Sequence, residues 1–281
     1  MISLIICSRR SDISSELTIN IQQTIGIDYE LIVIDNSSNK HSIFSAYNEG
    51  VSRAKSSYLC FAHEDILFHT PNWGMNIQKH FEDKTIGMLG FAGTHFFPSN
   101  PTYWFTSPFI SEYNLTNNHG KLTECFHLDL FRGKKLVDVV ACDGFCLFIR
   151  KELFKVISFD EKNFTGFHFY DMDICMQVLA IKLRVCICRD ILIEHFWSDS
   201  YSKSGKKSFD FNQNIFFDKW KDYFPISRGI DEIPGYVLTR LNGLSGAAYD
   251  AKMVRSSIAY KLGKFMLAPF KFLSNIKNRI K

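Results

Sequence analysis

The stretch AYNEGVSRAKSSYLCFAHED, residues 46–65, decides the fold of this chain. Its first half is compatible with a helix, and residues 57–62 form a short apolar run suited to a buried strand. His63, Glu64 and Asp65 follow that run directly. Ligands of open parallel sheets bind beyond the carboxyl ends of the strands, so this cluster is a candidate functional site. The alternative is that Glu64 and Asp65 cap the next segment.

Similar elements flank this stretch. Residues 2–7 and 30–35 are apolar runs typical of strands buried on both faces, and residues 14–24 and 43–54 have helical spacing. Strands that alternate with helices predict a parallel sheet with right-handed crossovers, which brings Cys7, Asp35 and Asp65 to one rim. Further helices are predicted over 72–81, 151–154 and 170–181, and further strands over 86–91, 136–141, 145–149, 184–188 and 191–194.

Residues 94–134 interrupt this pattern with three prolines and many aromatic side chains. We predict an irregular excursion there that covers or shapes a pocket.

The composition indicates a globular chain with an uneven charge. Of its 281 residues 46% are hydrophobic and 15% aromatic, enough for a sizeable core. Residues 251–281 carry eight Lys or Arg and no acidic residue, whereas residues 1–250 carry 25 basic and 29 acidic residues. A mildly acidic body argues against nucleic-acid binding.

The eight cysteines favour buried free thiols over disulfides, because five of them lie inside apolar runs. No CxxC pair occurs, which argues against a structural zinc site, although Cys142 and Cys146 could share a metal. We also find no signal peptide and no apolar run of about 18 residues that could span a bilayer. The expected location is cytoplasmic, on the inner face of the cell membrane.

The basic C-terminal segment has an apolar stripe that includes Val254, Ile258, Leu262 and Phe265, interrupted by Pro269. Such a segment is typical of a helix that lies on an anionic membrane surface. The alternative is a helix docked on the protein's own core.

Several motifs occur in order between residue 2 and about residue 200: ISLIICSRR, ELIVIDNSS, AYNEGVSRAKSSYLCFAHEDILF, NWG with IGMLGFAG, DGFCLFIRKELF, and FYDMDICMQ with IEHFW. Together they resemble bacterial family-two glycosyltransferases with the GT-A fold, in particular the streptomycin-biosynthesis-transferase-like branch. The resemblance implies an α/β, Rossmann-related, mostly parallel central sheet flanked by helices, to which we add the amphipathic helical tail.

The expected organisation is a glycosyltransferase domain over residues 1–240 and a membrane-associating tail over 241–281. Within the domain, residues 1–92 form the nucleotide-binding half, 93–200 the acceptor-side half, and 201–240 a closing loop and helix. The basic residues 202–208 are either a mobile loop that closes over the diphosphate or an ordinary solvated linker.

The resemblance places a nucleotide sugar at the strand ends. Asp35 matches an Asp that contacts the base or ribose, and the alternative is a turn former before Asn36. The other residues implied to bind the nucleotide sugar are Cys7, Ser8, Arg9, Asn48, His63 and Glu64.

The family's Asp-x-Asp position is occupied by residues 63–65. Asp65 matches the usual direct ligand of a divalent metal, Mn²⁺ or Mg²⁺, that neutralises the diphosphate leaving group. Position 63 holds His where many relatives hold Asp. His195 matches a His that reaches the metal or the diphosphate, and the alternative is a satisfied structural histidine.

The resemblance also implies an acceptor side. Asp171 matches the catalytic base, and its alternative role is to cap the helix it begins. Asp173 is a second candidate base, but side chains two apart on a helix point about 200° away from each other. Asp143 and Gly144 match a segment that lines the acceptor side, where glycine allows close backbone approach.

The predicted function is that of an inverting, metal-dependent glycosyltransferase of hexosyltransferase type. The implied donor is a UDP-, GDP- or dTDP-linked sugar, and the acceptor is a glycolipid or surface polysaccharide at the membrane. One alternative is a non-catalytic sugar-nucleotide or membrane-binding scaffold. Another is a nucleotidyltransferase, which the absence of glycine in Ser8–Ser11 disfavours.

Overall fold

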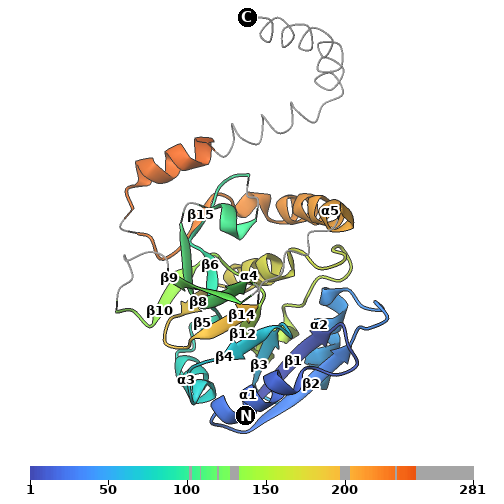
Figure 1. Cartoon of the computed structure of the whole chain (residues 1–281). Helices are drawn as coiled ribbons and strands as arrows, with labels where there is room; N and C mark the ends of the chain where they lie inside the picture. The colour runs from blue at the N-terminus through green and yellow to red at the C-terminus, as the bar shows by residue number, and fades with distance from the viewer. Residues whose placement is uncertain are drawn as a thin grey trace, which may run out of the picture.

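A seven-stranded sheet forms the centre of the chain (Figure 1). The computed structural model describes residues 1–244 except 101, 102, 108, 119, 127–132, 197–202 and 232. The strands follow the order β10-β13-β5-β12-β3-β1-β2. Their bounds are β1 (Ile2–Ser8), β2 (Tyr29–Asp35), β3 (Tyr58–Ala62), β5 (Ile86–Gly90), β10 (Leu136–Val139), β12 (Cys146–Arg150) and β13 (Arg184–Cys188).

The sheet is mostly parallel, as predicted. Strand β1 pairs in parallel with β2 and β3, and β13 pairs in parallel with β5. Strand β12 runs antiparallel between β3 and β5, and β10 is antiparallel to β13. Because β12 runs the other way, the residues before it lie at the rim where β3 ends. His63 N accordingly donates to Phe145 O at 2.9 Å.

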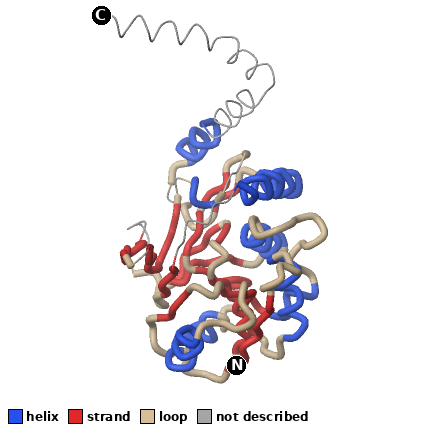
Figure 2. Tube along the Cα trace, turned by 45° about the vertical axis from the view of Figure 1, so that its right-hand side comes forward, coloured by secondary structure: helices blue, strands red, loops and turns tan. Residues whose placement is uncertain are grey.

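Helices surround the strands (Figure 2). They are α1 (Ser15–Thr24), α2 (Ile43–Arg53), α3 (Trp73–His80), α4 (Tyr170–Ala180) and α5 (Lys203–Trp220). Two serines start the first pair: Ser14 Oγ accepts from Leu17 N, and Ser42 Oγ from Ser45 N, both at 3.2 Å. Such caps satisfy amide groups that the first helical turn leaves unpaired. The helices predicted over 14–24, 43–54, 72–81 and 170–181 are confirmed to within two residues at each end. The one over 151–154 is a 3₁₀ helix, Lys151–Lys155.

A second sheet corrects the prediction of an irregular excursion over residues 94–134. It contains β4 (Ile66–Phe68), β6 (Ala92–Thr94), β8 (Ile110–Asn118), β11 (Ala141–Cys142) and β14 (Ile193–Phe196), and β9 (Lys121–Phe126) pairs with β8. A separate pair joins β7 (Phe96–Phe97) to β15 (Ile226–Ser227). Except for the β8–β9 hairpin, these strands pair with segments far away in the chain, and long-range pairing stabilises strands that have no clear local pattern.

Helix α5 corrects the prediction of a basic loop over residues 202–208, because residues 203–208 are its first turns. The helix buries Asn212, Phe216 and Trp220, which are spaced four residues apart. These three side chains pack the helix against the core, and the helix continues from them back through the basic residues at its start.

The helices in the described part of the chain are all too short or too polar to cross a bilayer. Residues 235–244 form a last described helix, and the predicted tail from residue 245 onward lies outside the described residues.

Candidate functional site

The carboxyl ends of β1, β2 and β3 lie at one rim, as predicted. Ser8 is the register partner of Asp35, and Ile6 that of Ala62. Ser8 Oγ donates to a Glu64 carboxylate oxygen at 2.5 Å and accepts from Arg10 N at 3.0 Å. The rim therefore joins the end of β1 to the residues that follow β3.

Asp35 is the exposed carboxylate of this rim. It accepts a hydrogen bond from Ser37 N at 2.9 Å, and hydrogen bonds to Ser37 hold the pKa of Asp35 below its usual value. An ionised, exposed carboxylate can accept from ligand hydroxyl or N–H groups. Asp35 thus stabilises the turn after β2, and its contact with the base or ribose stays a prediction.

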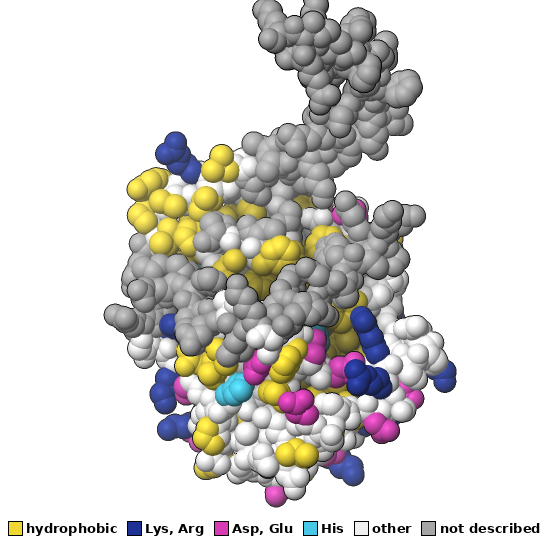
Figure 3. Space-filling model, in the orientation of Figure 1, with side chains coloured by type: hydrophobic (Ala, Val, Ile, Leu, Met, Phe, Trp, Pro, Cys, Tyr) yellow, Lys and Arg dark blue, Asp and Glu magenta, His cyan; other side chains and the backbone are white. Residues whose placement is uncertain are grey.

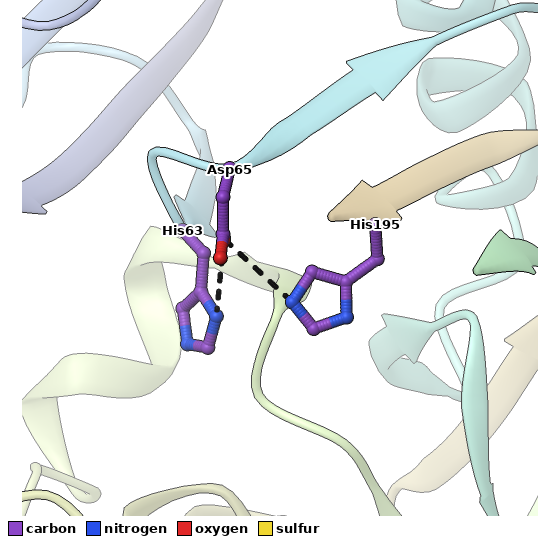
Figure 4. Close-up of side chains that lie close together, drawn as sticks. All are labelled: His63, Asp65 and His195. Carbon is purple, nitrogen blue, oxygen red and sulfur yellow. Dashed lines mark ion pairs between the residues drawn. The ribbon is translucent and has the colours of Figure 1, made fainter. Parts of the chain in front are cut away.

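His63, Asp65 and His195 form the candidate metal group, with the Asp65 carboxylate between two imidazole rings (Figure 4). Asp65 Oδ1 lies 3.8 Å from His63 Nδ1 and 3.6 Å from His195 Nε2. His195 comes close because β14 pairs with β4, where it faces Ile66. Its ring also stacks on Phe145, with centroids 4.7 Å apart.

The protonation states suit metal ligands. Burial raises the pKa of Asp65, but His195 and the charge of His63 outweigh that effect, so the pKa lies below its usual value. Burial and the neighbouring His195 lower the pKa of His63. The carboxylate is therefore ionised and the His63 imidazole neutral, which are the forms that bind metals.

The geometry also fits a cation. Asp65 Oδ1 is buried and has no hydrogen-bond partner among the residues that the structure describes. Its separations from the two imidazole nitrogens exceed hydrogen-bond length. Neighbouring ligands of a tetrahedral ion bound at about 2.0–2.2 Å stand roughly 3.3–3.6 Å apart, so a small inward movement would bring these atoms to one ion. A divalent ion would satisfy the oxygen and both nitrogens together.

Tyr170 connects this group to helix α4. Its Oη lies 2.9 Å from His63 Nε2, and its ring packs over Gly144. A Cβ on Gly144 would lie 2.0 Å from Tyr170 Oη, so only glycine fits under the ring. Gly144 thus has a packing role, and its predicted place on the acceptor side stays a prediction.

We expect Gly144→Ala to displace Tyr170 and break its contact with His63. Overpacking of this kind costs about 1–3 kcal/mol, measured as the free energy of unfolding in urea. Gly243→Ala is the matched control, because open space surrounds Gly243. Equal stability of the Gly144→Ala variant and wild type would contradict the packing role.

Asp171 is a buried carboxyl group on helix α4, 1% exposed. It accepts from Tyr103 Oη at 2.9 Å and from Met172 N at 2.9 Å. Burial and the charge of Asp143 raise the pKa of Asp171 to about 7. Asp143 itself accepts from Trp104 Nε1 at 3.0 Å. Such a shifted carboxyl is suited to proton transfer near neutral pH.

Asp173 is buried against α5, away from Tyr103. It accepts from Trp220 Nε1 at 2.8 Å and Gln177 Nε2 at 2.7 Å, and its Oδ1 lies 2.9 Å from Lys219 Nζ. These contacts hold α5 on α4, which is a structural role. Asp171 and Asp173 therefore point to different partners, as helical geometry predicts: Asp171 contacts Tyr103, and Asp173 contacts Lys219 and Trp220.

Asn48 likewise has structural contacts. Its amide donates to Phe159 O at 2.8 Å and accepts from Phe159 N at 3.1 Å, which ties α2 to the loop after the 3₁₀ helix. The predicted contact of Asn48 with a nucleotide sugar has no support in this arrangement.

The sequence analysis missed Tyr103 and Trp104 as contacts of the candidate site. Trp104 begins the 3₁₀ helix Trp104–Thr106, and Tyr103 precedes it. Tyr103 is 68 residues from its partner Asp171, and Trp104 is 39 residues from its partner Asp143. The only sequence signal was the density of aromatic residues between 94 and 134.

The chain has a mixed α/β fold of the GT-A-like kind, with a central sheet flanked by helices. The chain belongs to the glycosyltransferase-like family, whose pattern matches residues 3–220. A search of curated proteins gave no match.

Among solved structures, GalNAc-T7 with UDP, GalNAc and Mn²⁺ has a TM-score of 0.53 at 12% identity. The match covers 79% of this chain and 49% of that chain, so this chain spans about half of GalNAc-T7. A197 from STIV has a TM-score of 0.41 at 15% identity, over 70% and 86% of the two chains. S. aureus TarS 1-349 has 0.46 at 12% identity, over 69% and 60%.

Proposed function

We propose that this protein is an inverting, metal-dependent glycosyltransferase that moves a sugar from a nucleoside diphosphate to an acceptor hydroxyl. The observation that carries the proposal is the unpartnered Asp65 Oδ1 between His63 and His195. Family membership supports sugar transfer. The ordered motifs between residue 2 and about residue 200 are the basis for our proposal that the chain is similar to the streptomycin-biosynthesis-transferase-like branch, and the His at position 63 agrees with it.

We place the donor at the strand rim. Ser8, Arg9, Asp35 and Glu64 would contact the nucleotide, while Asp65 and His195, with His63, would hold the metal near the diphosphate. GalNAc-T7, the neighbour with the same fold, was crystallised with UDP and Mn²⁺. A divalent cation such as Mn²⁺ or Mg²⁺ would stabilise the charge on the departing diphosphate.

We assign the base role to Asp171. In an inverting transfer the acceptor oxygen attacks the anomeric carbon on the side opposite the diphosphate, so the acceptor proton needs a fixed base. Asp171 is joined to the metal group through the neighbouring Tyr170, whose hydroxyl contacts His63. The Tyr103 hydroxyl donates to Asp171, and we propose that an acceptor hydroxyl replaces it there.

The pH profile tests this assignment. A base must be deprotonated, so activity is expected to rise as pH increases through about 7. Tyr103→Phe removes a hydrogen bond that lowers the pKa of Asp171, so the rise should move to higher pH. Asp143→Asn removes a charge that raises this pKa, so the rise should move to lower pH. Shifts in the same direction for both variants would contradict the assignment.

The function is tested directly by nucleoside diphosphate release from a panel of UDP-, GDP- and dTDP-sugars, with and without Mn²⁺ or Mg²⁺. A metal-stimulated release supports the transferase. A scaffold would bind a nucleotide sugar, seen as a thermal shift, but release no diphosphate. A nucleotidyltransferase would release pyrophosphate from a nucleoside triphosphate instead.

We further propose that the domain of residues 1–240 works at an anionic membrane, with residues 241–281 as its contact and a glycolipid or polysaccharide as acceptor. Tyr236 and Leu244 lie in the helix over residues 235–244 and are 69% and 67% exposed. Hydrophobic side chains gather at the upper left of the molecule in Figure 3. Eight cations follow in residues 251–281. Each would add about 1 kcal/mol near anionic lipid.

Vesicle sedimentation tests the membrane contact. We expect the full chain to bind vesicles containing phosphatidylserine and the chain truncated after residue 244 to lose most of that binding. Neutral phosphatidylcholine vesicles are the control, and equal binding of both chains to anionic vesicles would contradict the proposal.

A further inference from the structure

Three metal-binding side chains meet outside the site described above. His80 ends helix α3, Cys188 ends β13, and Asp190 follows two residues later. His80 Nε2 lies 2.8 Å from Asp190 Oδ1, and Cys188 Sγ donates to the same oxygen at 3.1 Å. All three ligand atoms lie within 4.8 Å of one another. Two segments about 110 residues apart thus bring one nitrogen, one sulfur and one oxygen to a point.

The donor set is one that zinc prefers. Imidazole, thiolate and carboxylate bind Zn²⁺ at about 2.0–2.3 Å, so ligands of a tetrahedral ion stand roughly 3.3–3.8 Å apart. The observed separations of 2.8 and 3.1 Å are hydrogen-bond lengths. Opening the trio by about half an ångström would make room for the ion. Side-chain adjustments at His80 and Asp190, which are 11% and 19% exposed, would provide this space.

The surroundings provide access and a fourth ligand. His80 and Asp190 line a pocket of about 680 Å³, together with Lys135 and Leu136. Lys135 Nζ lies 3.5 Å from Asp190 Oδ2, which directs the other carboxylate oxygen toward His80 and Cys188. Water from the pocket can occupy the fourth position, as it does in open zinc sites with three protein ligands.

We propose that His80, Cys188 and Asp190 bind one zinc ion, which links the end of α3 to the edge of the central sheet. The thiol proton that Cys188 now donates to Asp190 is released to solvent, and the thiolate binds the ion in its place. This site shares no residue with the His63, Asp65 and His195 group. It contains a sulfur ligand, which that group lacks.

Cobalt spectroscopy tests the site on the full-length protein after treatment with a chelator. One equivalent of Co²⁺ should give a thiolate-to-metal charge-transfer band, and Zn²⁺ should displace it and raise the Tm. Cys188→Ser should abolish the band. Cys7→Ser is the matched control, because Cys7 is only partly buried and lies at the rim of β1. Asp65→Asn should also keep the band.

His80→Gln covers the case in which Cys188→Ser fails to fold. It removes one of the three proposed ligands, and zinc affinity should fall by more than about 100-fold, beyond the range typical of substitutions at residues that only contact a metal ligand. Absence of the band in wild type, its persistence in Cys188→Ser, or unchanged zinc affinity in His80→Gln would overturn the proposal. Such results would identify the trio as a hydrogen-bonded link without a metal.

Discussion

Asp171→Asn is expected to lower sugar transfer by about 10²–10⁴-fold, the usual contribution of a positioned base. Asparagine keeps the shape of the side chain and can still accept from the Tyr103 hydroxyl. It cannot take a proton from an acceptor. The measurement is the rate of nucleoside diphosphate release at saturating donor and acceptor, at pH 8, where the wild-type carboxyl is ionised.

Stability measurements separate this loss from unfolding. The folded-state pKa of Asp171 is raised to about 7, so its favourable contribution to stability is present at low pH and is lost as pH rises through about 7. At pH 8 wild type carries a buried charge that asparagine does not. The Asp171→Asn variant should therefore be at least as stable as wild type in urea at that pH.

Asp173→Asn is the matched control, with the same substitution two residues away. It removes the carboxylate charge that pairs with Lys219 and accepts from Trp220 Nε1, so it should lower the free energy of unfolding by about 1.5–3 kcal/mol. The rate per folded molecule should stay close to wild type. The opposite result, with activity lost in Asp173→Asn and kept in Asp171→Asn, would give the base role to Asp173.

Asp65→Asn is expected to remove the stimulation by Mn²⁺ and to lower activity by roughly 10²–10³-fold. The reason is that a metal supplies several kcal/mol of charge stabilisation, and each 1.36 kcal/mol is tenfold in rate. Asparagine retains one oxygen but loses the charge that attracts the ion. Calorimetric titration with Mn²⁺ measures the binding directly.

An exposed aspartate gives the control for that experiment. Asp28→Asn changes the net charge by the same amount on the loop before β2, so it should leave Mn²⁺ binding unchanged. Wild-type affinity for Mn²⁺ in the Asp65→Asn variant would remove the metal from the proposed mechanism.

The part of the fold that the sequence predicted is the part in which each helix or strand has a recognisable local sequence pattern. Strands β1, β2 and β3 are short apolar runs, and α1 and α2 begin at capping serines. Their order alone places Asp35 and Asp65 at one rim. Strands β4 and β8 could not be predicted equally well, because their pairing with β14 joins residues far apart in the chain.

The candidate site likewise has a part that the local sequence pattern predicts and a part that it does not. His63 and Asp65 follow a recognisable strand, so their neighbourhood was evident from local pattern. The contact of Tyr103 with Asp171 depends on how the 94–134 segment folds back, which no local pattern encodes. Helical geometry separated Asp171 from Asp173 in direction, but only the packing of α5 shows which carboxyl is held by a structural lysine.

The near-complete burial of Asp171 affects how fast water could hydrolyse a bound sugar donor before the acceptor binds. Solvent reaches almost none of this carboxyl, and a phenol already occupies one of its oxygens. If Asp171 is the base, as we propose, a water molecule in the site meets no free base, and hydrolysis of a bound sugar donor should be slow. On the same proposal, transfer would begin only when an acceptor hydroxyl replaces the Tyr103 hydroxyl on Asp171, so that acceptor binding starts catalysis.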